Sequence, residues 1–162
     1  MKITVIAVGK LKERYLEDGV AEYAKRLSRY CRLEILQAAD EKTPEGAGAV
    51  QEERIKEKEG GRILGFLEKI GSGAYVIALA IQGQMPDSVE LAQKLERLGV
   101  EGVSHVVFII GGSLGLSKAV LSRADCLMSF SRLTFPHQLM RVILLEQVYR
   151  SFRIAANEPY HK

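Results

Sequence analysis

The last residues of the chain carry side chains that are typical of an active site. His161 can exchange a proton near neutral pH, and Tyr160 supplies an aromatic ring with a hydroxyl group. Pro159 limits fraying by fixing the backbone angle φ, and Lys162 adds a positive charge. The alternative is a tail that docks on the protein for stability only. The sequence therefore predicts either a catalytic tail or a structural one.

Three glycines follow the apolar run at residues 105–110. Gly111, Gly112 and Gly115 lie in the segment IIGGSLGLS, where glycine permits a positive φ and a close approach of the backbone to a ligand. A tight turn between a strand and a helix would use the same residues. Only Gly9 follows the first apolar run, so the chain lacks the dinucleotide-binding fingerprint, and it contains no P-loop. The pattern predicts a ligand site late in the chain.

The segment SFSRLTFPH at residues 129–137 is unusually apolar for a loop. Leu133 and Phe135 stand where a surface loop normally carries polar side chains. They are either buried by packing or form apolar walls around a flat aromatic ligand such as adenine. A third candidate loop, LAIQGQMPDS, occupies residues 79–88. We expect the three loops to meet, because ligands bind at the carboxyl ends of the strands in doubly wound sheets.

The last helical segment is apolar over more than one stripe and carries an isolated arginine. Glu146, Arg150 and Arg153 share a polar face, whereas Arg141 lies well round the helix from them. An arginine in that position needs an anion, either a bound phosphate or an internal carboxylate. The wide apolar surface predicts deep burial or a subunit interface. We expect an obligate homodimer, because that surface would be an exposed patch on a monomer.

The positive charge of the chain is concentrated at its end. From Ser129 onward, five bases and two acids account for the whole net charge of +3. A polyanionic partner such as nucleic acid would suit this charge, although an ordinary solvated helix face has the same composition. The five bases are Arg132, Arg141, Arg150, Arg153 and Lys162.

The rest of the chain has the pattern of one compact α/β domain, expected over residues 1–162. The 162 residues are 47 % hydrophobic, which is enough for a single core. Continuous apolar runs alternate with helical periodicity, and this order predicts a doubly wound, mostly parallel sheet. The expected strands lie at residues 3–9, 32–38, 74–81, 105–110 and 126–131, and the longer helices at 11–30, 51–70, 89–99 and from about 136.

Details of the helices and the absence of other signals complete the prediction. Asp87 or Ser88 would cap the third long helix and Thr134 the last, while Gly60 and Gly61 would weaken the second. The cysteines and histidines form no metal-binding pattern, and no run has the length of a membrane span or the form of a signal peptide. We therefore expect a cytoplasmic protein with no metal.

The motifs IIGGSLGLS, SRLTFPHQLMRVILLEQVYRSFRI and the terminal N-x-PYHK together resemble the small bacterial SPOUT methyltransferase family of ribosomal RNA methyltransferase H. The resemblance covers essentially the full chain. It implies S-adenosylmethionine as methyl donor and N3 of a pseudouridine in 23S rRNA as target, on the large ribosomal subunit or the assembled ribosome. It also implies a homodimer and a five- to six-stranded sheet with a C-terminal trefoil knot, formed by threading the end of the chain through a loop.

The same resemblance implies roles for individual residues. For the expected methyl transfer, His161 could act as the base, Tyr160 could stack on or hydrogen-bond to the target base, and Arg141 could hold phosphate. In the family, the dimer brings residues of one subunit near the cofactor of the other, so the tail could complete the neighbouring site. Ser113 and Leu114 depart from the Pro-Glu pair found in some relatives. This difference does not affect the backbone of the glycine segment, which would hold the cofactor. The cofactor residues would be Leu79, Gly111, Phe130, Ser131, Arg132, Leu133, Thr134 and Phe135. Two other functions fit the sequence: a non-catalytic RNA- or ribosome-binding module on the same fold, and a nucleotide-binding enzyme of flavodoxin-like fold.

Overall fold

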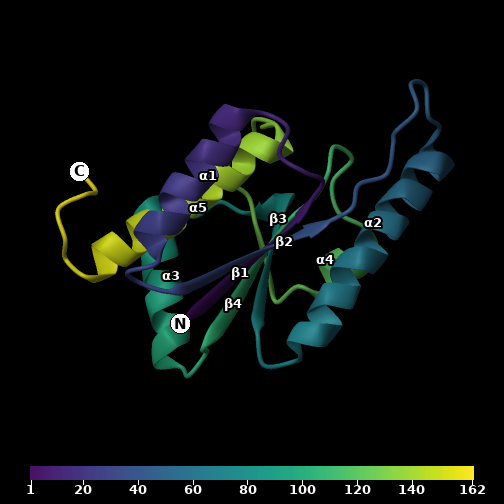
Figure 1. Ribbon diagram of the computed structural model, residues 1–162. Helices are drawn as coiled ribbons and strands as arrows, with labels where there is room; N and C mark the ends of the chain where they lie inside the picture. The colour runs from purple at the N-terminus through teal and green to yellow at the C-terminus, as the bar shows by residue number, and fades with distance from the viewer.

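Five parallel strands form the centre of the computed structural model, which describes residues 1–162 (Figure 1). Their order in the sheet is β2-β1-β4-β3-β5, and every neighbouring pair is parallel. The predicted doubly wound α/β fold is confirmed, with five strands. β3 runs past its expected end, and β5 is shorter than expected. The strands are β1 (Lys2–Val8), β2 (Arg32–Ala38), β3 (Tyr75–Gln84), β4 (His105–Ile110) and β5 (Cys126–Met128).

Helices cover both faces of the sheet, which explains why the strands are apolar without alternation. α1 (Arg14–Leu27), α3 (Ser88–Val100) and α5 (His137–Ala155) lie on one face, and α2 (Ala49–Ile70) and α4 (Lys118–Arg123) on the other (Figure 1). Along β1, Val5 contributes to the core beneath the first group and Ile6 to the core beneath the second. Both are at most 1 % exposed. Strands covered on both faces carry mostly apolar side chains. The buried Thr4 of β1 is an exception, and its hydroxyl is hydrogen-bonded to His105.

The predicted helices are present, and the capping prediction is confirmed at α3 and wrong at α5. Asp87 and Glu90 form a reciprocal capping box at the start of α3. α2 continues unbroken through Gly60. Only glycine fits at this position, because a Cβ there would lie 2.3 Å from Oγ of Ser117, the residue that caps α4. This glycine permits close packing of two helices. Pro136, and not Thr134, occupies the capping position of α5, and no side chain caps that helix.

One part of the apolar surface of α5 is buried within a single chain. α5 lies between α1 and α3 (Figure 1), and Leu144, Leu145 and Val148 are at most 1 % exposed. None of the large apolar side chains that are exposed belongs to α5. Deep burial therefore accounts for part of the wide apolar surface, while Leu139, Val142, Ile143 and other apolar side chains of α5 stay half-buried. The homodimer expected from this surface stays a prediction. None of the five helices combines the length and the apolar character that a membrane-spanning helix needs.

Gly83 is required by the pairing of β3 with β5. Leu79 and Gln84 both pair with Met128, so β3 bulges between them, and a Cβ on Gly83 would lie 2.5 Å from backbone atoms of Leu127 and Met128. We expect Gly83→Ala to lower the free energy of unfolding by about 1–3 kcal/mol in chemical denaturation, since backbone must move. The control is Gly61→Ala on the open surface of α2, which should raise it by about 0.5–1 kcal/mol. Equal stability of Gly83→Ala and wild type would contradict the prediction.

Candidate active site

A cleft lies at the carboxyl ends of β3, β4 and β5, where the three predicted loops meet. Its walls come from the end of β3, the glycine loop after β4, the segment between β5 and α5, and the first turn of α5 through His137 and Met140. Arg132 is exposed and does not line the cleft. The structure thus brings together seven of the eight predicted cofactor residues: Leu79, Gly111, Phe130, Ser131, Leu133, Thr134 and Phe135.

The glycine loop closes on itself, and this closure explains two of its glycines. The N–H of Gly115 donates to the carbonyl of Gly112 at 3.1 Å, and Gly115 has a φ of +86°. A Cβ on Gly111 would lie 3.0 Å from the carbonyl carbon of Gly115 and 3.1 Å from the side chain of Leu116. A side chain at Gly111 would therefore push the loop open and reshape the wall of the cleft.

Glu59 supports the glycine loop from behind, a role that the sequence reading missed. Its carboxylate is 5 % exposed; one oxygen accepts the backbone N–H of Glu41 at 3.0 Å, and the other has no partner. A Cβ on Gly112 would lie 3.2 Å from that free oxygen. Burial raises the pKa of Glu59. The signal was present in the sequence: Glu59 stands in the buried stripe of α2 between Ile55 and Ile63, four residues from each.

The segment between β5 and α5 is held by its own serines and leaves apolar side chains at the cleft. Ser129 Oγ donates to the carbonyl of Ser131, and Ser131 Oγ accepts the N–H of Leu133, both at 2.9 Å. Leu133 is 72 % exposed and Ile81, across the cleft, is 65 % exposed. Packing within the chain therefore does not explain the apolar character of Leu133. Apolar walls with nearby backbone groups suit a flat aromatic ligand.

Arg141 is buried and its partners are backbone carbonyls. The side chain is 2 % exposed, and Nη2 donates to the carbonyls of Val8 at 3.1 Å and Gly9 at 2.7 Å. Nε and Nη1 have no partner, and burial lowers the pKa of the guanidinium. No carboxylate pairs with it, and it does not line the cleft. Arg141 joins the second turn of α5 to the end of β1, and this geometry does not suit the predicted contact with phosphate.

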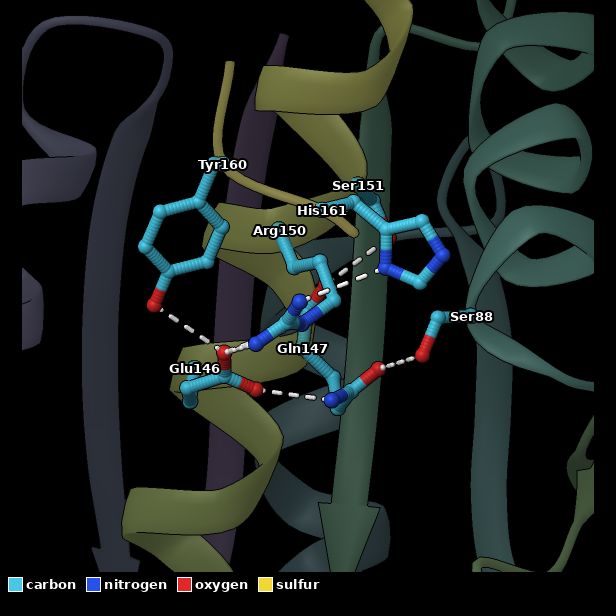
Figure 2. A network of polar contacts seen from close by, with 7 residues as sticks. All are labelled: Ser88, Glu146, Gln147, Arg150, Ser151, Tyr160 and His161. Carbon is cyan, nitrogen blue, oxygen red and sulfur yellow. Dashed lines mark hydrogen bonds and ion pairs between the residues drawn. The ribbon is translucent and has the colours of Figure 1, made fainter.

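The tail forms a polar network with the second half of α5 (Figure 2). The Tyr160 hydroxyl donates to Glu146 at 3.1 Å, and Arg150 forms an ion pair with the same carboxylate at 2.6 Å. Arg150 Nη1 lies 3.2 Å from His161 Nδ1. The Tyr160 ring meets Tyr149 edge-on at 5.0 Å. The predicted catalytic residues Tyr160 and His161 are therefore held together, with Glu146 and Arg150 as their partners.

This network determines how Tyr160 and His161 can donate and accept hydrogen bonds. Burial and the carboxylate of Glu146 raise the pKa of Tyr160 to about 12, so its hydroxyl is neutral near pH 7. A guanidinium can only donate, so in this contact Nδ1 of His161 accepts from Arg150, which leaves Nε2 as the ring nitrogen that can donate to a ligand.

Within one chain the tail does not reach the cleft. His137 lies at the cleft, and Arg150 is thirteen residues further along α5, which corresponds to about 20 Å. Tyr30, two residues before the start of β2, stacks on Phe152 and donates to Glu158. The tail therefore lies at the amino ends of the strands, at the opposite edge of the sheet from the cleft.

The concentrated positive charge of the last segment is largely neutralised. Arg150 pairs with Glu146, and Arg153 pairs with Glu158 at 3.0 Å. Arg141 is buried. The two acids of the segment thus pair with two of its five bases, and a third base does not reach the surface. The charge at this end of the chain is a weaker argument for a polyanionic partner than the sequence indicated.

Comparisons with known proteins agree over the whole length of the chain. The family model described as predicted SPOUT methyltransferase matches residues 1–161. The protein named ribosomal RNA large subunit methyltransferase H from Bifidobacterium adolescentis is 60 % identical over 162 residues, which are the whole of both chains. The protein of the same name from Clostridium kluyveri is 56 % identical over the same full length.

Two solved structures share the fold at low sequence identity. A probable methylase family protein from Haemophilus influenzae has a TM-score of 0.54 at 12 % identity, over 99 % of this chain and 70 % of that one. A putative methylase family protein from Neisseria gonorrhoeae has the same TM-score and identity, over 99 % of this chain and 85 % of that one. The full-length matches identify the chain as a member of the SPOUT methyltransferase family, in the group of the ribosomal RNA large subunit methyltransferase H proteins.

Proposed function

We propose that this enzyme transfers a methyl group from S-adenosylmethionine to N3 of a pseudouridine in 23S rRNA of the large ribosomal subunit. The observation that carries the proposal is the cleft, which gathers seven residues expected at the cofactor in a chain 60 % identical to a ribosomal RNA methyltransferase. We further propose that residues 1–162 form a single domain, and that the enzyme acts in the cytoplasm on the subunit or the assembled ribosome.

The residues of the cleft fit S-adenosylmethionine. The glycine loop forms a cradle that a Cβ at Gly111 would disturb, and the apolar side chains of Leu79 and Phe135 suit an adenine ring. When bound, the cofactor supplies an electrophilic methyl group on a sulfonium. We also propose the C-terminal knot implied by the family. It is supported by the segment before α5, which lies beside the glycine loop in one cleft.

The polar network of the tail provides the groups that would receive the target base. We propose that Tyr160 and His161 contact the pseudouridine, with the Nε2–H of His161 donating to a carbonyl oxygen of the base. The methyl acceptor must lose its N3 proton, and Glu146 is the only carboxylate of the network that can take it. Arg150 holds Glu146 and His161 in place through its two contacts. Arg141 acts as a positioning residue for α5.

We propose a homodimer in which each tail serves the cleft of the other subunit. About 20 Å of helix separates a tail from its own cleft, so a second copy is needed to bring them together. The exposed apolar side chains at the cleft, Ile81 and Leu133, are surfaces that a second copy would cover. The separation of tail and cleft is therefore the main support for this arrangement.

The function is tested by mass spectrometry of 23S rRNA from cells that lack this protein. We expect one N3-methylpseudouridine to become unmodified pseudouridine and to return when the gene is restored. Calorimetry on the purified protein should show binding of S-adenosylmethionine. A binding module without catalysis predicts unchanged rRNA in the deletion strain, and that result would refute the proposed reaction.

A further inference from the structure

We propose that the segment Lys10–Tyr15, which runs from the loop after β1 into the first turn of α1, is an RNA-binding surface beside the cleft. The inference rests on the proposed function and names a surface on which the ribosomal RNA would lie. Three bases fall within five residues of the segment, followed by one aromatic residue: Lys10, Lys12, Arg14 and Tyr15. Glu13 is the only acid in the segment.

The segment lies next to the cleft. The backbone N–H of Lys12 donates to Oε1 of Gln138 in the first turn of α5 at 3.1 Å. A Cβ on Gly9 would lie 3.8 Å from Nε2 of His137, which lines the cleft. Figure 1 shows the connection from β1 to α1 beside the start of α5. RNA whose target nucleotide enters the cleft would therefore pass over this segment.

The charges of this segment are free to meet phosphate, unlike those of the tail. Lys10 and Lys12 are exposed and take part in none of the ion pairs of the structure. Arg14 approaches Asp18 at 4.0 Å, with both side chains more than 70 % exposed, so solvent screens that contact strongly. Arg132, which is exposed on the loop before α5, adds positive charge at the same edge of the sheet. Phosphate contacts of this kind dominate the affinity for nucleic acid.

Tyr15 supplies a stacking surface. Its side chain is 71 % exposed, and it is the only exposed aromatic residue of the chain. The other tyrosines are at least partly buried, and four of them pack against one another around α5. An exposed aromatic ring among lysines and arginines is the arrangement that binds single-stranded RNA, since every base can stack on it. An unpaired nucleotide next to the target is the group that we expect on Tyr15.

The experiment measures binding of the full-length protein to ribosomes purified from cells that lack it. We expect Lys10→Gln/Lys12→Gln to weaken binding at least about tenfold and to lower the slope of log Kd against log salt by about 1.5. Tyr15→Ala should weaken binding about tenfold, whereas Tyr15→Phe, which keeps the aromatic ring, should bind like the wild type. The control, Lys58→Gln/Lys69→Gln on α2, removes the same charge from the opposite face and should leave binding near wild type. Affinity for S-adenosylmethionine should not change in any variant.

The outcomes separate this surface from the reaction. Wild-type affinity and salt dependence in Lys10→Gln/Lys12→Gln, or a loss no greater than in the α2 control, would overturn the proposal. A parallel loss of cofactor affinity would overturn it as well, because the segment would then be part of the cofactor site. Ribosome binding that depends on the segment, without methyl transfer by the wild type, would support the surface and refute the proposed reaction. Failure of the wild type to bind ribosomes would refute the surface.

Discussion

Deleting Tyr160–Lys162 should abolish methyl transfer, a loss of at least about a thousandfold, while cofactor affinity changes less than about twofold. The deletion removes the hydroxyl that donates to Glu146 and the imidazole that contacts Arg150, and both lie at the opposite end of α5 from the cleft of the same chain. Turnover on ribosomes and calorimetry with S-adenosylmethionine are the two measurements. Removal of the exposed Lys162 alone is the control and should leave most of the activity.

A mixed dimer then shows which cleft each tail serves. One subunit carries the tail deletion, and the other carries Gly111→Val with its tail intact. If the tails cross the interface, the intact tail meets the intact cleft, and the mixed dimer should regain one of its two sites although both homodimers are inactive. An inactive mixed dimer would indicate that each tail serves its own cleft. Full activity of the truncated homodimer would remove the tail from the mechanism.

The variant Gly111→Val should lose binding of S-adenosylmethionine by at least about a hundredfold and keep its fold. A Cβ at this position already lies 3.0 Å from the carbonyl carbon of Gly115, and the branched side chain must push the glycine loop away from its closed form. The change affects an exposed loop and leaves the core intact, so cooperative unfolding should persist. Ser113→Ala, in the same loop but exposed, is the control and should bind normally. Wild-type affinity in folded Gly111→Val would refute the assignment of the cleft.

The fold and the position of the cleft were predictable, because both depend on local patterns. Continuous apolar runs such as HVVFII indicated buried parallel strands, and Asp87 with Glu90 marked the start of α3. The rule that ligands bind at the carboxyl ends of strands predicts that the segments at the ends of β3, β4 and β5 meet. The residues from the first segment that line the cleft, Leu79–Ile81, belong to β3 itself. Of the eight residues expected at the cofactor, only Arg132 does not line the cleft.

The remaining features depend on contacts between distant segments. The partners of Arg141 are carbonyls more than 130 positions away, and no charge pattern indicates them. Glu146 and Arg150 are four residues apart in a helix, and this spacing indicates an ion pair between them. The charge pattern of the last segment instead places Arg150 among the positive charges that could meet a polyanion. The burial of the apolar face of α5 by two other helices could not be distinguished from an interface by periodicity alone. Glu59 could have been found as an acid in an apolar stripe.

The most direct test of the proposed reaction uses purified protein, S-adenosylmethionine with a labelled methyl group, and ribosomes from cells that lack this protein. Nucleosides from the 23S rRNA are separated and identified by mass spectrometry after incubation. We predict that label appears at N3 of one pseudouridine, approaching one methyl group per ribosome, with wild-type protein and not with Gly111→Val. Label on another atom or another nucleotide, or no label despite tight binding of the cofactor, would contradict it.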